Sequence, residues 1–282
     1  MQTAFTSAPI LVIGSTGKTG RRIAARLKAL GHAVREGSRQ SATPFDWDQP
    51  ATWAPALRGV HSAYISYSPD LGFPGADERI EALTRLAVAA GLKHVVLLSG
   101  RNEAAAQRCE GIVQASGLSH TLVRAAWFNQ NFSEGFLRDA VLEGALAMPA
   151  GEVREPFVDV EDIADVAVAA LTDPRHAGKA YDLTGPRLLS FAQVAAEISA
   201  AAGRPLRYVP VSLLDFHAGM LAVVGEPLAG LFTGLCEEVL DGRNEHLDDG
   251  VQQALGRAPR DFADFCRESA RAGVWAETGV AR

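Results

Sequence analysis

Residues 10–20 read ILVIGSTGKTG, and this stretch determines the fold class that we assign to the chain. Its first four residues are all apolar, which is typical of a strand buried on both faces. Glycines follow at positions 14, 17 and 20, and apolar residues then recur at helical spacing over residues 23–30. A strand, a glycine turn and a helix N-terminus in this order are typical of a βαβ unit that binds a dinucleotide.

The three glycines would have separate physical roles in such a turn. Gly14 lets the chain turn sharply after the strand, Gly17 lets backbone approach a pyrophosphate, and Gly20 lets the helix pack closely. The free N–H groups and the positive dipole end of the helix would then face the phosphates. The alternative is a glycine-rich turn without a ligand, since 27 glycines in 282 residues can match this spacing by chance.

The composition of the chain indicates a globular protein and excludes some partners. The 282 residues are 48% hydrophobic and 21% charged, which is ordinary for a globular protein with a substantial core. A net charge of -6 argues against a basic surface for nucleic acid. The first residues lack the pattern of a signal peptide, and no apolar run approaches the roughly 18 residues that span a bilayer. We therefore expect a cytoplasmic protein without a nucleic-acid or membrane partner.

Cysteine, histidine and acidic residues show no pattern of a metal site or of a hydrolase. The three cysteines are isolated, so we expect free thiols, and the seven histidines have no metal-ligand spacing. Ser99-Gly100 lacks the G-x-S-x-G motif of serine hydrolases. The acidic residues between positions 159 and 165 could form a catalytic carboxylate cluster, but helix capping and dipole charges explain them better.

Strand-like and helix-like segments alternate through the first half of the chain. The strand-like segments are residues 10–13, 34–37, 60–66, 95–99 and 118–124. This alternation predicts an α/β fold with a Rossmann-type, doubly wound parallel sheet. Further short strands are expected at residues 157–160, 181–183 and 206–209, while the pattern after residue 190 is mostly helical. We expect a Rossmann domain over residues 1–185 and a smaller, mostly helical C-terminal cap for substrate over residues 186–282.

The residues after the second expected strand bear on the choice of cofactor. A unit that prefers NAD usually has an acidic residue here, which accepts hydrogen bonds from the adenosine ribose. This chain reads Glu36-Gly37-Ser38-Arg39, and the planar guanidinium of Arg39 suits a 2'-phosphate, to which Ser38 could add a hydrogen bond. Glu36 would favour NAD if it pointed toward the ribose, and Arg39 could be only a solvated loop charge. We expect NADP, with NAD as the alternative.

Asp46 and Trp47 follow in a polar loop. An acidic group beside an aromatic ring could contact the adenine through its amine and its face. A surface turn with a half-buried tryptophan is nearly as good an explanation.

Two later segments have the composition of a ligand pocket. The loop over residues 66–76 follows the carboxyl end of a strand, where open α/β sheets bind ligands, and its Tyr67 could stack on nicotinamide. Residues 124–132 combine aromatic rings with amides, which suits a pocket wall, and Asn131 is our choice for a substrate contact. In both segments, packing at the edge of the core is an equally good explanation.

Several motifs in order give the chain a family resemblance. They are GSTGKTG at 14–20, SR at 38–39, FDWD at 45–48, VVLLSG at 95–100, LVRAAWFNQNFSEGF at 122–136, PFVDVEDIADVAVAAL at 156–171 and LTGPRLLSFAQVAAEIS at 183–199. With these motifs the chain resembles the NmrA-like branch of the atypical short-chain dehydrogenase/reductases. It is especially similar to the ergot-alkaloid-type subgroup, which comprises the agroclavine and festuclavine dehydrogenases and their bacterial relatives.

The resemblance implies a Rossmann core, NADP(H) and a substrate cleft between that core and the C-terminal part. It implies a pyrophosphate site at the glycine turn, an adenosine phosphate site after the second strand, and a nicotinamide site after the third and fourth. The residues that it implies are Gly14, Thr16, Gly17, Lys18 and Thr19 for the pyrophosphate, Ser38 and Arg39 for the adenosine phosphate, Asp46 and Trp47 for the adenine, and Ser66, Tyr67 and Ser99 for the nicotinamide half. The glycine spacing adds Gly20 to the expected cofactor-binding residues.

One departure from the family pattern bears on the reaction. Typical short-chain dehydrogenases use Tyr-x-x-x-Lys, in which the lysine lowers the tyrosine pKa so that the phenol exchanges a proton with substrate. These positions fall near Asn102 and Ala106, and the chain contains no such pair. Carbonyl reduction by that mechanism is therefore disfavoured, and we expect hydride transfer to an imine, a quinone or an activated alkene.

The candidate catalytic residues are Tyr67, Ser99, Asn102 and Asn131, and none of them is singled out by the sequence. The leading hypothesis is an NADPH-dependent reductase. The rival is a regulatory protein of the NmrA type that senses dinucleotide without turnover and acts through a protein partner. A homodimer is compatible with either hypothesis.

Overall fold

The opening of the chain folds as predicted, with a strand followed by a glycine turn and a helix. In the computed structural model, which describes residues 8–276, strand β1 (Ile10–Ile13) is buried along its whole length. Helix α1 (Lys18–Ala29) buries one face, with Ile23 and Leu27 at its centre. The apolar run is therefore a buried strand and the helical spacing marks an amphipathic helix, as the sequence predicted.

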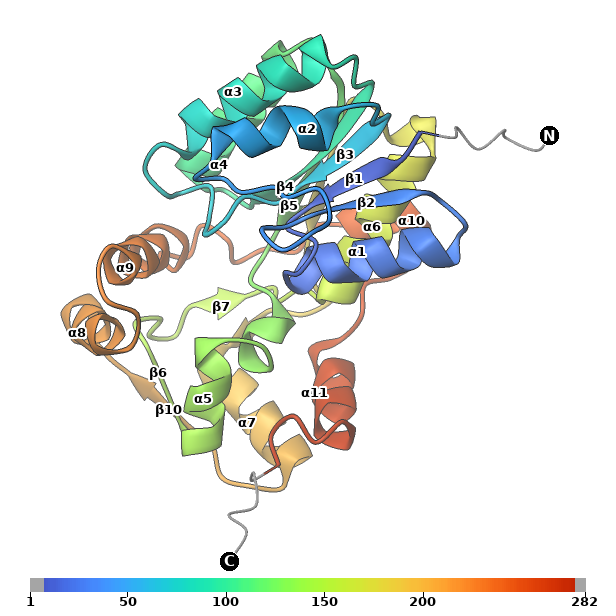
Figure 1. Ribbon diagram of the computed structural model, residues 1–282. Helices are drawn as coiled ribbons and strands as arrows, with labels where there is room; N and C mark the ends of the chain where they lie inside the picture. Colours follow the sequence, from blue (N-terminus) through green and yellow to red (C-terminus); the bar gives the residue numbers. More distant parts are fainter. Residues whose placement is uncertain (1–7, 277–282) are drawn as a thin grey trace, which may run out of the picture. The chain divides into compact units, whose positions relative to one another are not determined.

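Strand β1 belongs to a six-stranded sheet in which every pair of neighbours is parallel (Figure 1). The strand order is β2-β1-β3-β4-β5-β8. This order reverses direction beside β1, as in a doubly wound sheet, and confirms the predicted Rossmann-type α/β fold. The other five strands are β2 (Val34–Gly37), β3 (Ser62–Ile65), β4 (His94–Gly100), β5 (Ser119–Ala125) and β8 (Lys179–Leu183).

Helices cover both faces of this sheet (Figure 1). One face carries α2 (Trp53–Leu57), α3 (Ala76–Ala89) and α4 (Ala104–Ala115), whose apolar side chains join those of the strands in one core. The other face carries α1 together with α6 (Val160–Thr172) and α10 (Gly250–Leu255). Since parallel sheets need cover on both faces, this arrangement explains why the strands read as continuous apolar runs.

Carboxylates at the start of α6 connect the helices of the second layer. Glu161 and Asp162 lie in the first turn of α6, where their charge also complements the helix dipole. The ion pairs of this group include Arg22–Glu161 at 2.5 Å, Arg26–Asp165 at 2.8 Å, Arg257–Asp162 at 2.8 Å and Arg257–Asp165 at 2.6 Å. The structural explanation of these acidic residues is therefore better supported than the catalytic one.

The chain divides into two compact units, each of which has most of its contacts within itself. Among the described residues, the first unit, which contains the sheet, comprises residues 8–125, 160–183 and 249–257. The second comprises residues 126–159, 184–248 and 258–276. Each unit is thus built from three stretches of sequence, and the predicted division into residues 1–185 and 186–282 stays a prediction about folding domains.

The second unit has its own aromatic core. Phe132, Phe157, Phe191 and Phe262 pack with ring centroids 5.3 to 6.4 Å apart. Such edge-on and tilted contacts add to the free energy gained by burying the rings. The helices around this core are α5 (Phe136–Glu143), α7 (Phe191–Ala202), α8 (Leu213–Val224), α9 (Leu228–Val239) and α11 (Phe262–Arg271).

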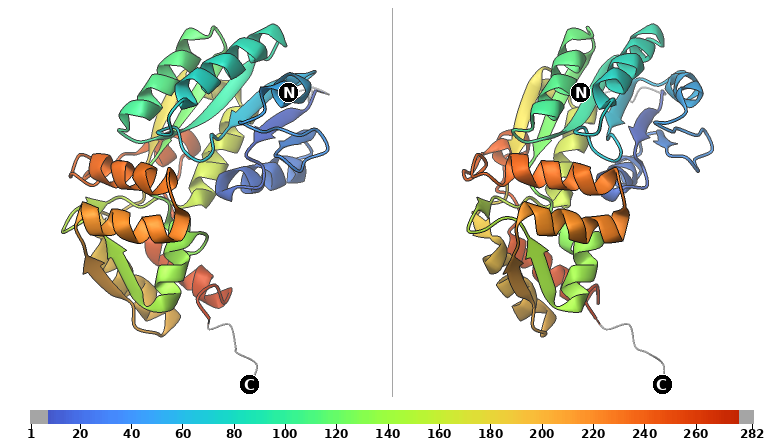
Figure 2. Two further views of the ribbon diagram at one scale, coloured as in Figure 1. Left: turned by 60° about the vertical axis from the view of Figure 1, so that its left-hand side comes forward. Right: turned by 90° about the vertical axis from the view of Figure 1, so that its left-hand side faces the viewer.

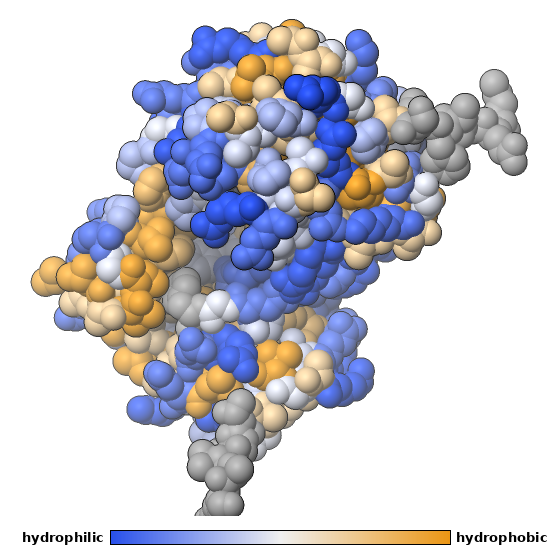
Figure 3. Space-filling model, viewed as in Figure 1, coloured by the Kyte–Doolittle hydropathy of each residue, from blue (hydrophilic) through white to orange (hydrophobic). Residues whose placement is uncertain are grey.

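Helices α8 and α9 form a hairpin within the second unit, and both views of Figure 2 show them side by side. Leu214, Leu221 and Val223 of α8 are exposed. Apolar side chains accordingly gather over this hairpin in Figure 3. Among residues 8–276, no helix combines the length and the apolar composition that crossing a bilayer requires.

The short strands of the second unit differ partly from the prediction. Residues 157–160 form no strand, because only Val158 makes a bridge, to Phe128. Strand β6 (Ala145–Met148) was not predicted, and it pairs in parallel with β10 (Arg207–Pro210). Another unpredicted pair joins β7 (Arg154–Glu155) to β9 (Leu189–Ser190).

Candidate dinucleotide site

The glycine turn after β1 is shaped by close approaches of backbone to backbone. A Cβ atom on Gly20 would lie 2.1 Å from the carbonyl oxygen of Gly14, so only glycine fits there. Gly14 itself has φ +76° and donates its N–H to the carbonyl of Gly37 at 2.9 Å. Gly17 is exposed, and a Cβ there would meet only the Gly14 carbonyl oxygen, at 3.2 Å. The turn is therefore tight on its inner side and open at Gly17, as a cradle for phosphate requires.

The N-terminus of α1 is suited to an anion. Gly17 is its N-cap and supplies no capping side chain, and the first turn contains no acidic residue. Thr16 is exposed and Lys18 is half-buried beside it. The N–H groups and the positive dipole end of this 12-residue helix therefore favour negative charge at the turn.

A buried tyrosine supports the turn from the sheet. The hydroxyl of Tyr64, in β3, donates to Oγ1 of Thr19 at 2.8 Å, and both side chains are buried. The Tyr64 hydroxyl also bonds to the side chain of Ser66, and burial raises the pKa of the phenol. Thr19 and Ser66 are thus fixed next to Gly14, whose added Cβ would lie 3.2 Å from Cβ of Ser66. Tyr64 was not predicted as part of the site, since it reads as an ordinary residue of a buried strand.

The carboxyl end of β2 shows where the Glu36 side chain points. Its carboxylate forms an ion pair with Lys28 on α1, so it is directed toward the helix. Gly37 follows, and a Cβ there would lie 3.1 Å from the carbonyl oxygen of Val12. Arg39 is exposed, and within the described part of the chain it has no acidic partner. The end of β2 therefore presents a free guanidinium and no free carboxylate.

Asp46 and Trp47 both contribute to the packing of the loop after β2. The Asp46 carboxylate accepts the N–H of Asp48 at 3.0 Å, which closes a local turn. Trp47 is buried, and its indole N–H donates to the Ser66 carbonyl at 3.3 Å. Its ring lies 4.6 Å from that of Tyr67. The tryptophan is therefore a core residue, and contact with adenine by this pair stays a prediction.

Tyr67 is also packed in this aromatic group. Its phenol oxygen accepts a hydrogen bond from Nη1 of Arg79 at 3.0 Å, and Arg79 forms an ion pair with Asp48 at 3.0 Å. Burial raises the pKa of Tyr67, although the Arg79 guanidinium opposes this shift. The phenol is thus directed toward α3 and protonated at neutral pH.

The carboxyl end of β4 carries a buried polar network. Ser99 is 4% exposed, and its hydroxyl donates to the carboxylate of Glu110 at 2.6 Å. Arg124 binds both oxygens of this carboxylate at 2.7 to 3.1 Å and lies 3.6 Å from Asp182. Because a hydroxyl has one proton, Ser99 can accept a hydrogen bond from a ligand but has no proton left to donate.

The connection from β4 to α4 has an unusual backbone. Asn102 has φ +60°, a conformation that few residues except glycine and asparagine adopt readily. A Cβ atom on Gly100 would lie about 2 Å from the Glu103 carboxylate, so that side chain crosses directly over Gly100. The loop at the predicted tyrosine position is therefore constrained, and its residue carries an amide instead of a phenol.

The carboxyl ends of β1 to β4 bring together Gly14, Ser38 and Ser66, which follow β1, β2 and β3, and Ser99, the last residue but one of β4. Asn131 belongs to the second unit and lies in a short turn next to Gln130, whose amide donates to Asp159 at 2.8 Å. The sequence did not indicate Glu110, because an acidic residue within a helix usually faces solvent. The described residues contain no group of three or more potential metal ligands.

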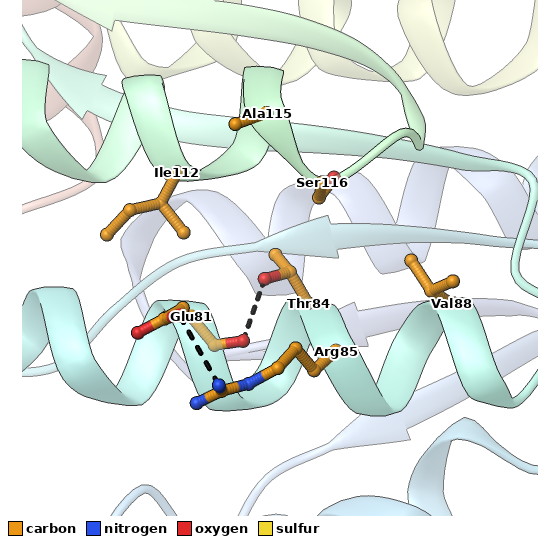
Figure 4. A pocket seen from close by; sticks show the side chains of 7 residues that line it. All are labelled: Glu81, Thr84, Arg85, Val88, Ile112, Ala115 and Ser116. Atoms are coloured by element: carbon orange, nitrogen blue, oxygen red, sulfur yellow. Dashed lines mark hydrogen bonds and ion pairs between the residues drawn. The ribbon is translucent and has the colours of Figure 1, made fainter.

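One cavity of the first unit lies away from these strand ends. It has a volume of about 420 Å³ and lies between α3 and α4 (Figure 4). Its walls include Thr84 and Val88 of α3 and Ile112 of α4. None of the candidate site residues lines it.

Comparison with known proteins gives consistent matches along the chain. Residues 44–255 match the model of the NmrA-like family. An NAD(P)H azoreductase from Xenophilus azovorans is 33% identical, over 93% of this chain and 98% of the relative. An agroclavine dehydrogenase from Claviceps fusiformis is 31% identical, over 94% of this chain and 98% of the relative. The Escherichia coli NADPH-dependent quinone oxidoreductase QOR2, solved with NADPH, has a similar fold, with a TM-score of 0.73, 23% identity and coverage of 92% and 99%.

Proposed function

Because this chain belongs to the NmrA-like family, we propose that it is a reductase that transfers hydride from NADPH to a small electron-poor acceptor. An imine, a quinone or an activated alkene would be such an acceptor. The observation that carries the proposal is the cradle at the sheet edge, where an open glycine turn and an uncapped helix N-terminus lie beside the end of β2, which continues to the free Arg39. The relatives add support, since the matched proteins include an NAD(P)H azoreductase and an agroclavine dehydrogenase.

The residues at this edge fit an NADP-type dinucleotide. The turn from Gly14 to Gly20 and the N–H groups of α1 would hold the pyrophosphate, with Thr16 and Lys18 beside it. Arg39 would pair with the adenosine 2'-phosphate, to which a guanidinium can donate two charge-assisted hydrogen bonds. Glu36 would not compete for the ribose, because its carboxylate is paired with Lys28.

The bound nicotinamide would supply a hydride, and the protein would contribute position and exclusion of water more than a proton. The Ser99 proton is held by Glu110, and burial raises the pKa of the Tyr67 phenol, which makes it a weaker acid. Asn102 carries an amide, which cannot act as an acid near neutral pH. An acceptor that takes hydride without a protein acid, with water supplying any proton, agrees with all three observations.

Asn131 and residues 186–282 are assigned to the acceptor side as part of this proposal. Asn131 lies beside a buried polar group in which Gln130 and Asn129 both donate to Asp159. An amide next to such a fixed group could orient a polar atom of the acceptor. This assignment predicts that Asn131→Ala raises the KM for the acceptor and leaves NADPH affinity unchanged.

The test is consumption of NADPH by the purified protein with a panel of acceptors. The panel contains a quinone, a cyclic imine, an activated alkene and, as a control, a simple ketone. We expect turnover with at least one of the first three and none with the ketone. Binding of NADPH without consumption by any acceptor would favour the dinucleotide-sensing alternative. Reduction of the ketone would require a protein proton donor and would contradict transfer without one.

A further inference from the structure

The turn after β2 contains a second serine that contacts Ser38 directly. The N–H of Ser38 donates to Oγ of Ser41 at 3.0 Å, and the two hydroxyl oxygens lie 2.8 Å apart. The N–H of Ser41 donates to the Ser38 carbonyl at 3.2 Å, and the N–H of Phe45 donates to the same oxygen at 3.0 Å. Four hydrogen bonds therefore fix the backbone and the side chain of Ser38, and two of them end on the Ser41 hydroxyl.

The protons of this serine pair can be counted. Two hydroxyl groups 2.8 Å apart share only one of their two protons, so the other proton points away from the pair. Oγ of Ser41 already accepts the N–H of Ser38, which favours Ser41 as the donor in the shared bond. Across residues 8–276 neither hydroxyl has a further acceptor. The hydroxyl of Ser38 is then left with a proton to donate outside the pair.

The surroundings of this proton favour an anion. Arg39 is the next residue, and its exposed guanidinium has no acidic partner in the described part of the chain. The nearest acidic residue in sequence, Glu36, is held by Lys28 on α1. The turn thus offers a hydroxyl donor and a cation but no free carboxylate, which is the donor set of a phosphate site and unlike a site for a ribose hydroxyl.

We propose that Ser41 is a positioning residue for the adenosine 2'-phosphate. It holds the Ser38 backbone and directs the Ser38 proton outward, so that Ser38 and Arg39 bind the phosphate together. This inference rests on the proposed use of NADPH and explains how the chain would distinguish it from NADH. Ser41 does not itself have to touch the phosphate.

The test compares phosphate-bearing ligands with ligands that lack the phosphate. Affinities of the wild type, Ser41→Ala, Ser41→Thr and Ser38→Ala are measured by calorimetry for NADPH and NADH. Adenosine 2',5'-bisphosphate and ADP serve as smaller ligands for the same comparison, since the first has the 2'-phosphate and the second lacks it. Ser41 is half-buried and lines an open cavity beside β2, so removal of its hydroxyl leaves the packing of the core intact, and thermal unfolding checks this for each variant.

We expect Ser41→Ala to weaken NADPH and the bisphosphate by about 3- to 10-fold, as for the loss of one hydrogen bond, and NADH and ADP by less than about 2-fold. Ser41→Thr keeps the hydroxyl and should restore the affinity for NADPH. Because Ser41 acts on the side chain and on the backbone of Ser38, and only the backbone contact survives in Ser38→Ala, the double variant should lose less NADPH affinity than the two single losses added together.

The outcomes separate this inference from the function on which it rests. A wild-type protein that binds neither NADPH nor NADH would overturn both the proposed function and this inference. Equal weakening of NADPH and NADH by Ser41→Ala would show a merely structural role and overturn the inference alone. The inference would also be overturned if the losses from Ser41→Ala and Ser38→Ala simply added in the double variant.

Discussion

The hydroxyl of Ser99 donates its proton to the carboxylate of Glu110 across 2.6 Å, and both side chains are buried. Arg124 holds the same carboxylate from the other side through two of its nitrogens. The serine at the end of β4 is thus oriented by residues of α4 and β5, with its oxygen lone pairs left for a ligand. A hydroxyl in this state positions a ligand but does not protonate it.

Removal of the three polar side chains near the predicted nicotinamide site should slow the chemical step only modestly. For Ser99→Ala, Tyr67→Phe and Asn102→Ala we expect single-turnover rates within about 10-fold of the wild type, whereas loss of a general acid costs at least about 100-fold. The reason is that the Ser99 proton is held by Glu110, the raised pKa of Tyr67 makes its phenol a weaker acid, and the amide of Asn102 does not ionise. Stopped-flow measurement with saturating NADPH and one quinone gives these rates.

A loss of about 100-fold or more in Tyr67→Phe, with intact NADPH affinity, would contradict this expectation. It would mean that the phenol bound by Arg79 replaces the missing family tyrosine. Arg79→Met is the matched control, because it should then reproduce most of the loss by removing the group that opposes the raised Tyr67 pKa.

Arg39 should account for most of the preference for NADPH. Arg39→Ala is expected to weaken NADPH by about 1.5 to 3 kcal/mol through loss of charge-assisted hydrogen bonds, with NADH affected far less. Glu36→Gln is the matched control, and it should leave the ratio of the two affinities unchanged because Lys28 holds the carboxylate. Titration of both dinucleotides measures these affinities, and tighter binding of NADH than of NADPH by the wild type would refute the cofactor assignment.

Two glycines of the turn should respond differently to substitution. Gly17→Val places a branched side chain on the open side of the turn, so it should abolish dinucleotide binding in a folded protein. Gly20→Ala forces a Cβ to within 2.1 Å of the Gly14 carbonyl oxygen and should also lower the free energy of unfolding, by roughly 1 to 3 kcal/mol. Calorimetry and thermal unfolding distinguish the two effects. Normal cofactor affinity in a folded Gly17→Val protein would show that the dinucleotide binds elsewhere.

A cluster of histidines at the amino ends of the strands should make stability depend on pH. Burial, together with the smaller effects of the positive charges of His120, His61 and His176, lowers the pKa of His94 from 6.5 to about 4. The folded state therefore binds fewer protons than the unfolded state in this range. The resulting stabilisation is complete above the unfolded pKa and is lost as the pH falls through 6.5 toward 4.

Denaturant unfolding near neutral pH and near pH 5 measures this effect. The wild type should lose on the order of 1 kcal/mol more than His94→Gln over this interval, a figure reduced for the partial exposure of the ring. Equal losses in the two proteins would mean that His94 does not contribute. Ser119 and Thr121, which contact the His94 ring, do not titrate and need no separate control.

The sequence predicted the sheet and its glycine turn because both depend on local patterns. The run at residues 10–13 and the glycines behind it identify β1 and the start of α1 without reference to the rest of the chain. The matches of the whole chain confirm the resemblance to the NmrA-like family that its motifs indicated. By contrast, β6 was missed because its partner β10 lies some sixty residues away and its four residues carry no strong pattern.

The side-chain contacts of the candidate site could not be predicted from local sequence patterns either, because they join residues that are distant in sequence. Glu110 occupies a helix position that looks solvated in sequence, and only the fold brings it to Ser99 and Arg124. The direction of the Glu36 side chain was left open because alternation along a four-residue strand does not fix which face is which. The ion pair with Lys28 settles that direction.

Hydride transfer from NADPH to an electron-poor acceptor is tested most directly by isotope labelling of the cofactor. The measurement is a single turnover with NADPH deuterated at one or the other C4 position, mixed with a quinone or a cyclic imine. We predict oxidation of the cofactor, a slower rate for one of the two deuterated faces only, and deuterium in the reduced product whenever that product keeps a C–H bond. NADPH that is bound by the protein and yet stays reduced with every acceptor of the panel would contradict this mechanism.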